Sequence, residues 1–235
     1  MAPKILVVLT SVAINPSNGQ EIGWYLPEFA HPWDVLKSKA DFVVASPKGG
    51  VAPINKQSIE LFASDPVSSK FHAEQKTLWE ETVKLSDVLG RVNEFDAIYY
   101  PGGHGPMFDL YSDAESVSLI EKFALAKKPI GAVCHGPAAL LNATLPSGEP
   151  LIASATVTGL SNDEEDTLGA TAAMPFSLED ELQRLSGGGF VKAAEKFGEK
   201  SVVSKVKGLE GALITGQNPA SAKAVGEALV EALGL

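Results

Sequence analysis

The sequence predicts an α/β protein in which a doubly wound, mostly parallel sheet carries helices on both faces. Continuous apolar runs, rich in β-branched or aromatic residues, occur at residues 4–10, 41–45, 97–100 and 129–134. Such runs are typical of strands that are covered on both sides in a parallel sheet. Each run leads into a segment that contains Gly or Pro, and helix-compatible stretches separate the runs. This alternation predicts βαβ units.

Residues 115–126 are the clearest of the predicted connecting helices. Their apolar side chains recur at helical spacing, at Val117, Ile120, Phe123 and Ala124. That spacing is expected of an amphipathic helix that lies on a sheet. Because residues that precede a proline disfavour the helical conformation, the helix should end before Pro129.

The C-terminal third continues the same alternation. Residues 156–158 and 213–215 are predicted to form short strands. Asn218 followed by Pro219 predicts an N-cap and the first position of a last helix, which runs to about residue 233.

The whole chain, residues 1–235, is predicted to form one domain. Its length lies in the range in which a single α/β domain is common, and it contains neither an internal repeat nor a dividing linker. Two stretches, residues 51–73 and 174–207, combine Gly, Ser and charged residues with weaker periodicity. We expect them to be insertions that cap a site at the strand ends.

The charge of the chain argues against nucleic-acid binding. It has 19 Lys and Arg residues against 29 Asp and Glu residues, a net charge of -10. The resulting field repels phosphate backbones and anionic membrane surfaces. No apolar run approaches the length of a membrane span, and the first residues show no recognisable export signal. We therefore expect a cytoplasmic protein that could also enter the nucleus.

The single cysteine, Cys134, excludes an internal disulfide and is either a packed residue or a reactive one. In residues 131–141, GAVCHGPAALL, a strand runs into Cys134, a Gly-Pro pair and a helix-forming stretch. A nucleophile at such a turn is exposed at the strand end, and the following helix favours its thiolate. A small buried residue is the alternative. The adjacent His135 and the permissive Gly136 favour the reactive interpretation, with a low thiol pKa.

A second loop, PGGHGP at residues 101–106, follows another predicted strand and should lie at the same sheet edge. Backbone N–H groups of Gly103 and His135 could stabilise an oxyanion on a carbonyl substrate. The alternative is a flexible loop without a chemical role. No phosphate-binding fingerprint follows any predicted strand, so a nucleotide cofactor is not expected.

Four motifs together make the chain similar to a known family: GGHG at 102–105, AVCHGP at 132–137, TGLSNDEE at 158–165 and LITGQNPASA at 213–222. The sequence resembles the ThiJ/PfpI superfamily, in its branch of heat-shock-protein-31-like glyoxalase III enzymes. The resemblance covers nearly the whole chain. It implies a class I glutamine amidotransferase-like fold, which is also described as flavodoxin-like.

The resemblance implies a triad of Cys134, His135 and Glu165, with Glu28 as the acid beside the sulfur. A carboxylate next to His135 would orient the imidazole and stabilise its charged form. A carboxyl such as Glu28, held against a thiolate in a partly apolar pocket, would stay protonated and donate a hydrogen bond. The alternatives are a solvated helical glutamate for Glu28 and a charge that complements a helix dipole for Glu165.

The remaining histidines carry no assigned role. His31 lies near Glu28 in the sequence and His72 lies in the first predicted insertion, and surface or packing roles are expected for both. The role of His104 stays open. No pair of histidines has the i, i+4 spacing of a helical metal motif and there is no cysteine cluster, so no metal site is predicted.

The activity implied by the resemblance is glutathione-independent conversion of methylglyoxal, or glyoxal, into a 2-hydroxy acid. This is the glyoxalase III reaction, of the D-lactate dehydratase type, which needs no cofactor. The chain would then be a lyase and, as the family suggests, a homodimer. Three alternatives remain open: a cysteine hydrolase, a holdase chaperone or redox sensor in stress responses, and a deglycase that repairs carbonyl-modified amines.

Overall fold

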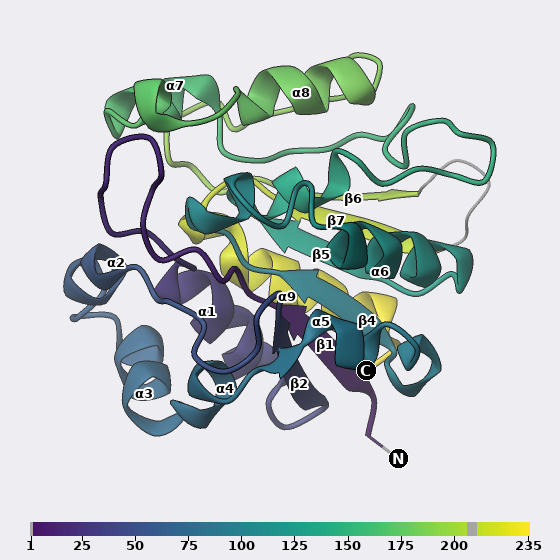
Figure 1. Ribbon diagram of the computed structural model, residues 1–235, viewed down its shortest axis with the longest axis horizontal. Coiled ribbons are helices and arrows are strands. Elements are labelled where there is room, and N and C mark those ends of the chain that lie inside the picture. The colour runs from purple at the N-terminus through teal and green to yellow at the C-terminus, as the bar shows by residue number, and fades with distance from the viewer. Residues whose placement is uncertain (1, 206–210) are drawn as a thin grey trace.

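A seven-stranded sheet organises the part of the chain that the computed structural model describes, residues 2–205 and 211–235 (Figure 1). The strand order is β3-β2-β1-β4-β5-β7-β6. All neighbouring pairs are parallel except β6 and β7, which are antiparallel. The strands are β1 (Lys4–Val8), β2 (Asp41–Ser46), β3 (Val83–Lys84), β4 (Ala97–Tyr100), β5 (Ile130–Val133), β6 (Ser201–Lys205) and β7 (Ala212–Gly216).

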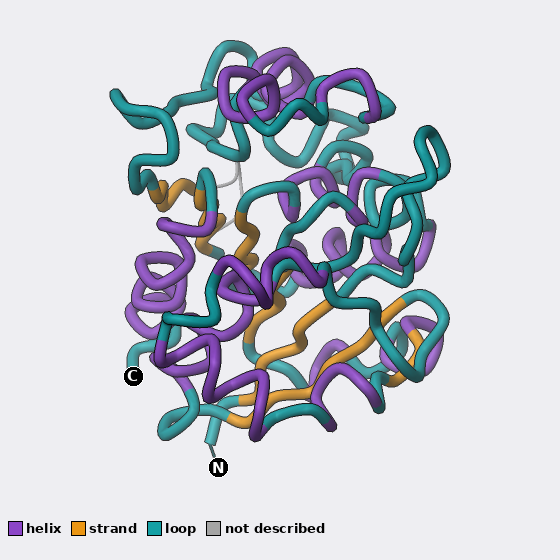
Figure 2. Tube along the Cα trace, turned by 90° about the vertical axis from the view of Figure 1, so that its left-hand side faces the viewer, coloured by secondary structure: helices purple, strands orange, loops and turns teal. Residues whose placement is uncertain are grey.

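Helices cover both faces of this sheet, as the strands between helices in Figure 2 show. The α-helices are α1 (Leu26–Leu36), α2 (Lys56–Leu61), α3 (Pro66–Glu74), α4 (Thr77–Glu80), α5 (Leu85–Val88), α6 (Ala114–Leu125), α7 (Asn162–Thr167), α8 (Leu178–Leu185) and α9 (Ala222–Ala232). Short 3-10 helices are η1 (Val92–Glu94), η2 (Gly105–Met107), η3 (Gly136–Leu140), η4 (Thr171–Ala173) and η5 (Pro219–Ser221). The doubly wound α/β fold predicted from the sequence is therefore confirmed.

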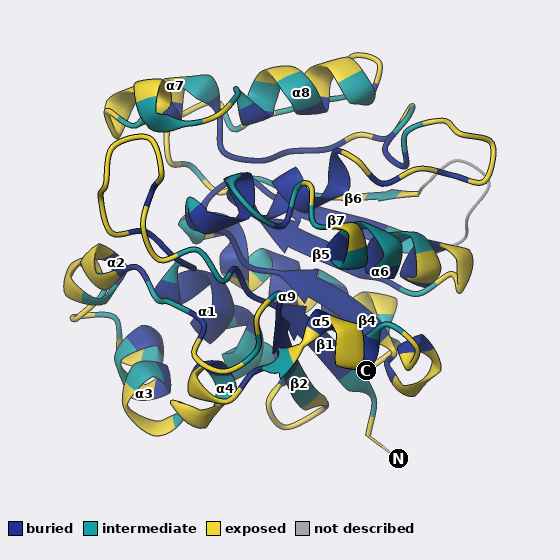
Figure 3. Cartoon of the chain, viewed as in Figure 1, coloured by how far each residue is buried: buried dark blue, intermediate teal, exposed yellow. Residues whose placement is uncertain are grey.

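The strands form two apolar cores because successive side chains point to opposite faces. In β1, Leu6 and Val8 pack into the core beneath α5 and α6, whereas Ile5 and Val7 pack into the core beneath α1 and α9. The central strands are almost fully buried, as Figure 3 shows in dark blue. This burial on both faces is the reason for the continuous apolar runs in the sequence.

Most predicted elements are confirmed, including the helix at residues 115–126, which is α6. The short strand expected at residues 156–158 is wrong: only Val157 forms an isolated bridge, to Phe190. Asn218 is the N-cap residue and Pro219 the first position of a helical segment, as expected, but that segment is the 3-10 turn η5, which precedes α9. The side chain of Asn218 makes no capping bond and instead donates to Glu164 and to the backbone of Gly198.

The two stretches of weak periodicity are more regular than the sequence suggested. Residues 51–73 contain α2 and most of α3, and residues 174–205 contain α8 and the antiparallel edge strand β6. Residues 206 and 207 of the second predicted insertion lie outside the described residues. The edge strands β3 and β6 were missed because their residues are largely half-buried or exposed and carry no apolar run. None of the helices described here is long and apolar enough to cross a membrane.

Candidate active site

Cys134 occupies a sharp turn directly after β5. Its φ is 60°, in the left-handed region that disfavours residues with a Cβ. Its N–H donates to the carbonyl of Gly216, 2.9 Å away, which continues the pairing with β7 to the turn. Gly136 lets the backbone after the turn pass close to β4, because a Cβ there would lie 2.2 Å from the carbonyl oxygen of Tyr100. Neighbouring backbone therefore enforces the strained turn that the sequence predicts.

Three side chains form a hydrogen-bonded line from the sulfur. The Sγ of Cys134 lies 3.4 Å from Nδ1 of His135. The Nε2 of His135 lies 2.5 Å from Oε2 of Glu165 and donates to it. All three residues are buried, with exposed fractions of 5%, 2% and 8%. The structure thus brings the predicted nucleophile, base and carboxylate together.

The position of Glu165 depends on how α7 begins. Ser161 and Glu164 form a capping box, in which each side chain bonds to the backbone of the other residue. Glu164 is fully buried, and its oxygens also accept hydrogen bonds from Gln217 and Asn218 in the loop between β7 and α9. Glu164 therefore anchors α7 to the sheet edge and holds Glu165 opposite His135.

The protonation of Glu165 follows from its two imidazole neighbours. Burial by itself would raise its pKa. The charge of His135 and hydrogen bonds from His104 and His135 outweigh that effect and hold the pKa of Glu165 well below its usual range. Glu165 is therefore a carboxylate at neutral pH and can orient a neighbouring imidazole.

Glu28 lies on the other side of Cys134, in the first turn of α1, and is completely buried. Its Oε2 accepts a hydrogen bond of 2.8 Å from the N–H of Gly102, while no N–H group of the described residues bonds to Oε1. Burial raises the pKa of Glu28 to about 8, although hydrogen bonds with Cys134 and Gly102 oppose the shift. The carboxyl is therefore protonated at neutral pH, and the solvated alternative is wrong.

The loop after β4 lies beside Cys134 because β4 and β5 are parallel neighbours. Gly103 has a φ of 87°, and a Cβ at this position would lie 2.2 Å from the carbonyl oxygen of Gly23. Only glycine fits there without displacement of the backbone. A hydrogen bond from the N–H of Gly103 lowers the pKa of Cys134. A backbone donor is thus directed at the sulfur, where the sequence predicts an oxyanion-binding group.

The pKa of the Cys134 thiol nevertheless differs from the prediction. Burial raises it well above its ordinary value, and the charge and hydrogen bond of Glu28 raise it further. The helix that follows is the short 3-10 segment η3, so its dipole is weaker than that of the expected α-helix. Because ionisation of either group raises the pKa of the other, Cys134 and Glu28 titrate as a pair. A thiolate at Cys134 therefore requires a protonated Glu28.

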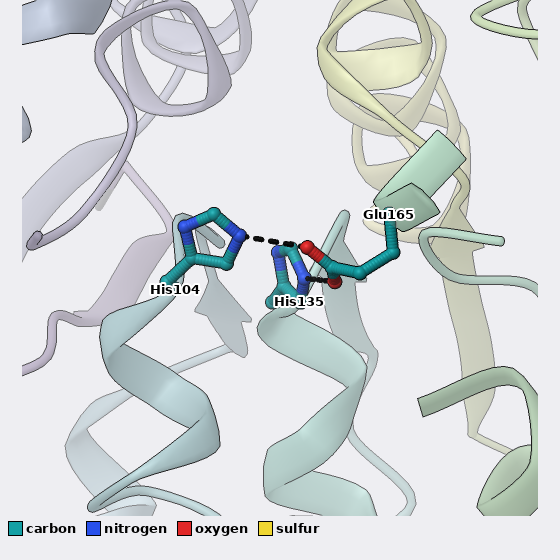
Figure 4. Close-up of side chains that lie close together, drawn as sticks. All are labelled: His104, His135 and Glu165. Atoms are coloured by element: carbon teal, nitrogen blue, oxygen red, sulfur yellow. Dashed lines mark hydrogen bonds and ion pairs between the residues drawn. The ribbon is translucent and has the colours of Figure 1, made fainter. Parts of the chain in front are cut away.

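His104 is the residue of the site that sequence reasoning left unassigned. Its Nε2 lies 2.9 Å from Oε1 of Glu165, so one carboxylate bonds to two imidazoles, as Figure 4 shows. Burial is the main cause that lowers the pKa of His104, and His135 adds to it. The only sequence signal was its place directly after Gly103. The three nitrogen and oxygen atoms of His104, His135 and Glu165 all lie within 4.8 Å of one another, close enough to hold a metal ion.

The other two histidines lie outside this cluster. His31 bonds to Asp65 at 2.9 Å and lies on the wall of the cavity in front of Cys134. His72 stacks on Trp79 and faces a separate, smaller pocket. Within the described residues, neither makes a hydrogen bond to Cys134 or Glu165.

A cavity of about 840 Å³ opens in front of Cys134 and His135. Its walls include apolar groups, among them Tyr25, Phe62 and Leu160. Both predicted cap segments contribute to the lining, through Asn55 and Phe62 in residues 51–73 and through Phe197 and Glu199 in residues 174–207. Burial raises the pKa of Tyr25 well above its ordinary range, with smaller contributions from Glu28 and Cys134. Tyr25 is thus a neutral hydroxyl group near the sulfur that the sequence analysis missed.

Comparisons with known proteins agree with this geometry. A curated relative, glyoxalase 3 of Candida albicans, is 30% identical over 97% of this chain and 98% of its own length. The glutathione-independent glyoxalase HSP31 of Saccharomyces cerevisiae is 25% identical over 99% of both chains. Among solved structures, the Rapid Encystment Protein 24 KDa of Francisella tularensis superposes with a TM-score of 0.89, at 32% identity, over 98% of this chain and 99% of its own.

Residues 26–232 match the DJ-1/PfpI family. That range contains Glu28, the loop with Gly103, the Cys134 turn and Glu165. The full-length similarity to glutathione-independent glyoxalases agrees with the motifs of the sequence. The chain therefore belongs to the DJ-1/PfpI family, on the side of its Hsp31-like glyoxalase III proteins.

Proposed function

We propose that the protein is a glutathione-independent glyoxalase that converts methylglyoxal, or glyoxal, into the corresponding 2-hydroxy acid. The observation that carries this proposal is the line from Cys134 Sγ through both nitrogens of His135 to Glu165, set beside a neutral Glu28. This line supplies a nucleophile, a base and an acid within one cavity. The full-length glyoxalase relatives support the same chemistry.

The first step is attack of the Cys134 thiolate on the aldehyde carbon of methylglyoxal. Nδ1 of His135 accepts the thiol proton, the carbon–sulfur bond forms, and the proton passes to the carbonyl oxygen, which becomes the hydroxyl of a hemithioacetal. The N–H of Gly103, which is directed at the sulfur, stabilises the charge that develops on this oxygen, together with the N–H of His135. Protonated Glu28 keeps a second negative charge away from the sulfur.

The second step moves a proton between neighbouring carbons. The Nε2 of His135 is occupied by Glu165, so Nδ1, on the side of the sulfur, is the nitrogen that takes the former aldehyde proton. Glu165 stabilises the imidazolium that results. The enediol then receives a proton on the adjacent carbon, which leaves the thioester of a 2-hydroxy acid on Cys134.

Water hydrolyses this thioester and releases the acid and the free thiol. One carbon is oxidised while its neighbour is reduced, so the net change is addition of one water molecule to methylglyoxal, and electrons balance without a redox cofactor. Formally this is the reverse of a D-lactate dehydration. The product predicted for methylglyoxal is D-lactate.

The decisive experiment compares wild type with Cys134→Ser, without glutathione. A serine hydroxyl stays protonated at neutral pH, so lactate formation should fall by about three orders of magnitude or more. Suppression of aggregation of a model substrate should be equal in the two proteins. Lactate formation that survives in Cys134→Ser, or wild type that suppresses aggregation but forms no lactate, would instead favour the holdase alternative.

The size of the cavity favours a second candidate, a deglycase that acts on carbonyl adducts of amines. A three-carbon substrate leaves most of the 840 Å³ empty, and the exposed Leu61, Leu168 and Phe197 all lie on the cavity wall. We propose that residues 51–73 and 174–207 act as a cap that contacts such larger substrates. A higher kcat/KM for a methylglyoxal-treated peptide than for free methylglyoxal would establish the deglycase as the main activity.

A further inference from the structure

His104 gives the site a donor group for which the proposed reaction has no use. The triad is complete with one imidazole on Glu165, yet the structure places a second, half-buried imidazole on its other oxygen. The two rings lie 4.6 Å apart between centroids. One carboxylate is thus shared by two nitrogens from separate loops, after β4 and after β5 (Figure 4).

The two imidazole nitrogens and the carboxylate oxygen form a set of ligands that divalent transition metals prefer. Imidazole nitrogen and carboxylate oxygen suit Zn²⁺, Co²⁺ and Ni²⁺. Two histidines and one carboxylate leave a further coordination position for water, as in catalytic zinc sites. His104 and His135 both line the cavity, so an ion can reach them from it.

The geometry needs only a small adjustment. Zinc binds nitrogen and oxygen ligands at about 2.0–2.2 Å, which places tetrahedral ligands about 3.3 Å apart. The present contacts to Glu165 are 2.9 Å from His104 and 2.5 Å from His135, and all three ligand atoms lie within 4.8 Å of one another. Rotation of the Glu165 side chain would open these two contacts, and the two imidazole nitrogens would move to about 3.3 Å from each other around the ion. The ion would replace the two Nε2 protons that now bridge the imidazoles to the carboxylate.

We propose that His104, His135 and Glu165 form a binding site for a divalent transition-metal ion, with Zn²⁺ as the probe, and that occupation of this site stops the cysteine chemistry. A bound ion takes the nitrogen of His135 that Glu165 holds, and it takes Glu165 itself. The imidazole is then no longer oriented by a free carboxylate or stabilised when it accepts a proton. Metal binding does not rest on the proposed glyoxalase activity, whereas the inhibition does.

Cys134 is not a ligand in this arrangement. Its Sγ lies 3.4 Å from Nδ1 of His135, whereas the ion would bind Nε2, on the far side of the same ring. The site therefore differs from one in which a cysteine thiolate binds a soft metal ion. Replacement of Cys134 should therefore leave metal binding intact.

The test titrates Zn²⁺ into metal-free protein against a chromophoric chelator. Wild type should bind one equivalent, and so should Cys134→Ser and the control His72→Gln, which alters a histidine outside the cluster. His104→Gln should bind at least about tenfold more weakly, because one of three ligands is lost. Glu165→Gln should show the same loss and serves if His104→Gln does not fold.

Substitution by Co²⁺ adds a readout of the ligands themselves. The visible spectrum should show metal-centred bands without a thiolate charge-transfer band, and it should be the same in Cys134→Ser. Equal Zn²⁺ affinity of wild type and His104→Gln, or loss of binding in Cys134→Ser, would overturn the site. Stoichiometric Zn²⁺ should stop lactate formation by wild type. Binding without inhibition would overturn the regulatory part, and metal-free wild type without activity would overturn only the proposed function.

Discussion

The two carboxyl groups on either side of the Cys134–His135 pair are the same residue type in opposite states. Glu28 is enclosed by α1 and the loop after β4, with one N–H donor on one oxygen and none on the other, and its pKa rises to about 8. Glu165 faces two imidazoles, and its pKa falls well below its usual range. Both are buried. Neighbouring charge, more than burial, therefore decides which carboxyl keeps its proton.

Replacement of Glu165 should have the largest effect on turnover. In Glu165→Gln no carboxylate stabilises the imidazolium of His135, so kcat should fall by about 10²- to 10⁴-fold. Iodoacetamide labelling of Cys134 should change little, because Glu165 is the smallest of the causes that act on the thiol pKa. A variant that keeps more than half of the wild-type kcat would remove Glu165 from the proposed mechanism. Unchanged thermal unfolding is the control.

Glu28→Gln should have a smaller effect on turnover and a larger effect on the thiol. The amide still donates a hydrogen bond but cannot exchange a proton. We expect kcat to fall by about 10- to 100-fold, which corresponds to the free energy of one hydrogen bond to a charged group. The variant also removes the Glu28 charge that raises the pKa of Cys134. Alkylation by iodoacetamide, measured against pH, should therefore rise at lower pH than in wild type. An unchanged profile would mean that the two groups are not coupled.

The stability of the fold should depend on the protonation of Glu28. Its pKa is raised from 4.5 to about 8, so the folded state holds a proton that the unfolded state has lost between these values. The contribution of this group to stability is therefore full below pH 4.5 and is lost as the pH rises towards 8. Gln does not titrate. The thermal midpoint of Glu28→Gln minus that of wild type should increase from pH 5 to pH 8, and a constant difference would argue against a protonated Glu28.

Ser161→Ala should have the smallest effect and tests how the Glu165 side is held. Loss of a side-chain cap costs about 0.5–2 kcal/mol of stability, and here it also loosens the start of α7. We expect a thermal midpoint lower by a few degrees and a kcat that falls by less than tenfold, with KM unchanged. The matched control is Asp113→Ala, which removes the side-chain cap of α6, a helix whose residues do not line the cavity. An equal loss of kcat in both variants would show a general effect of stability.

The fold could be predicted because its signals are local. Apolar runs identify the four parallel strands β1, β2, β4 and β5, because a strand that is buried on both faces is apolar throughout. Helical spacing identifies α6, because a helix that is buried on one face has apolar residues at regular intervals. The edge strands β3 and β6 are largely half-buried or exposed and leave no such pattern. The expected strand at residues 156–158 failed for the related reason that apolar and β-branched residues also pack in loops.

The residues of the candidate site also fall into two groups, those that could be predicted from the sequence and those that could not. Its members Cys134, His135, Gly103, Glu28 and Glu165 followed from turn chemistry or from motifs that the chain shares with its family. Glu164 and His104 did not, because their roles arise from contacts between residues far apart in the sequence. Glu164 bonds to Asn218, 54 positions away, and His104 bonds to Glu165, 61 positions away.

Sequence patterns and motifs were enough to predict the candidate catalytic residues and the strands that bring them to one edge of the sheet. Their protonation and their partners follow from contacts that exist only in the folded chain. A pKa depends on burial and on charges within a few ångströms, and a cluster of ligands depends on atoms that meet in space. Spacing along the chain therefore argued against a metal site, whereas His104, His135 and Glu165 meet within 4.8 Å.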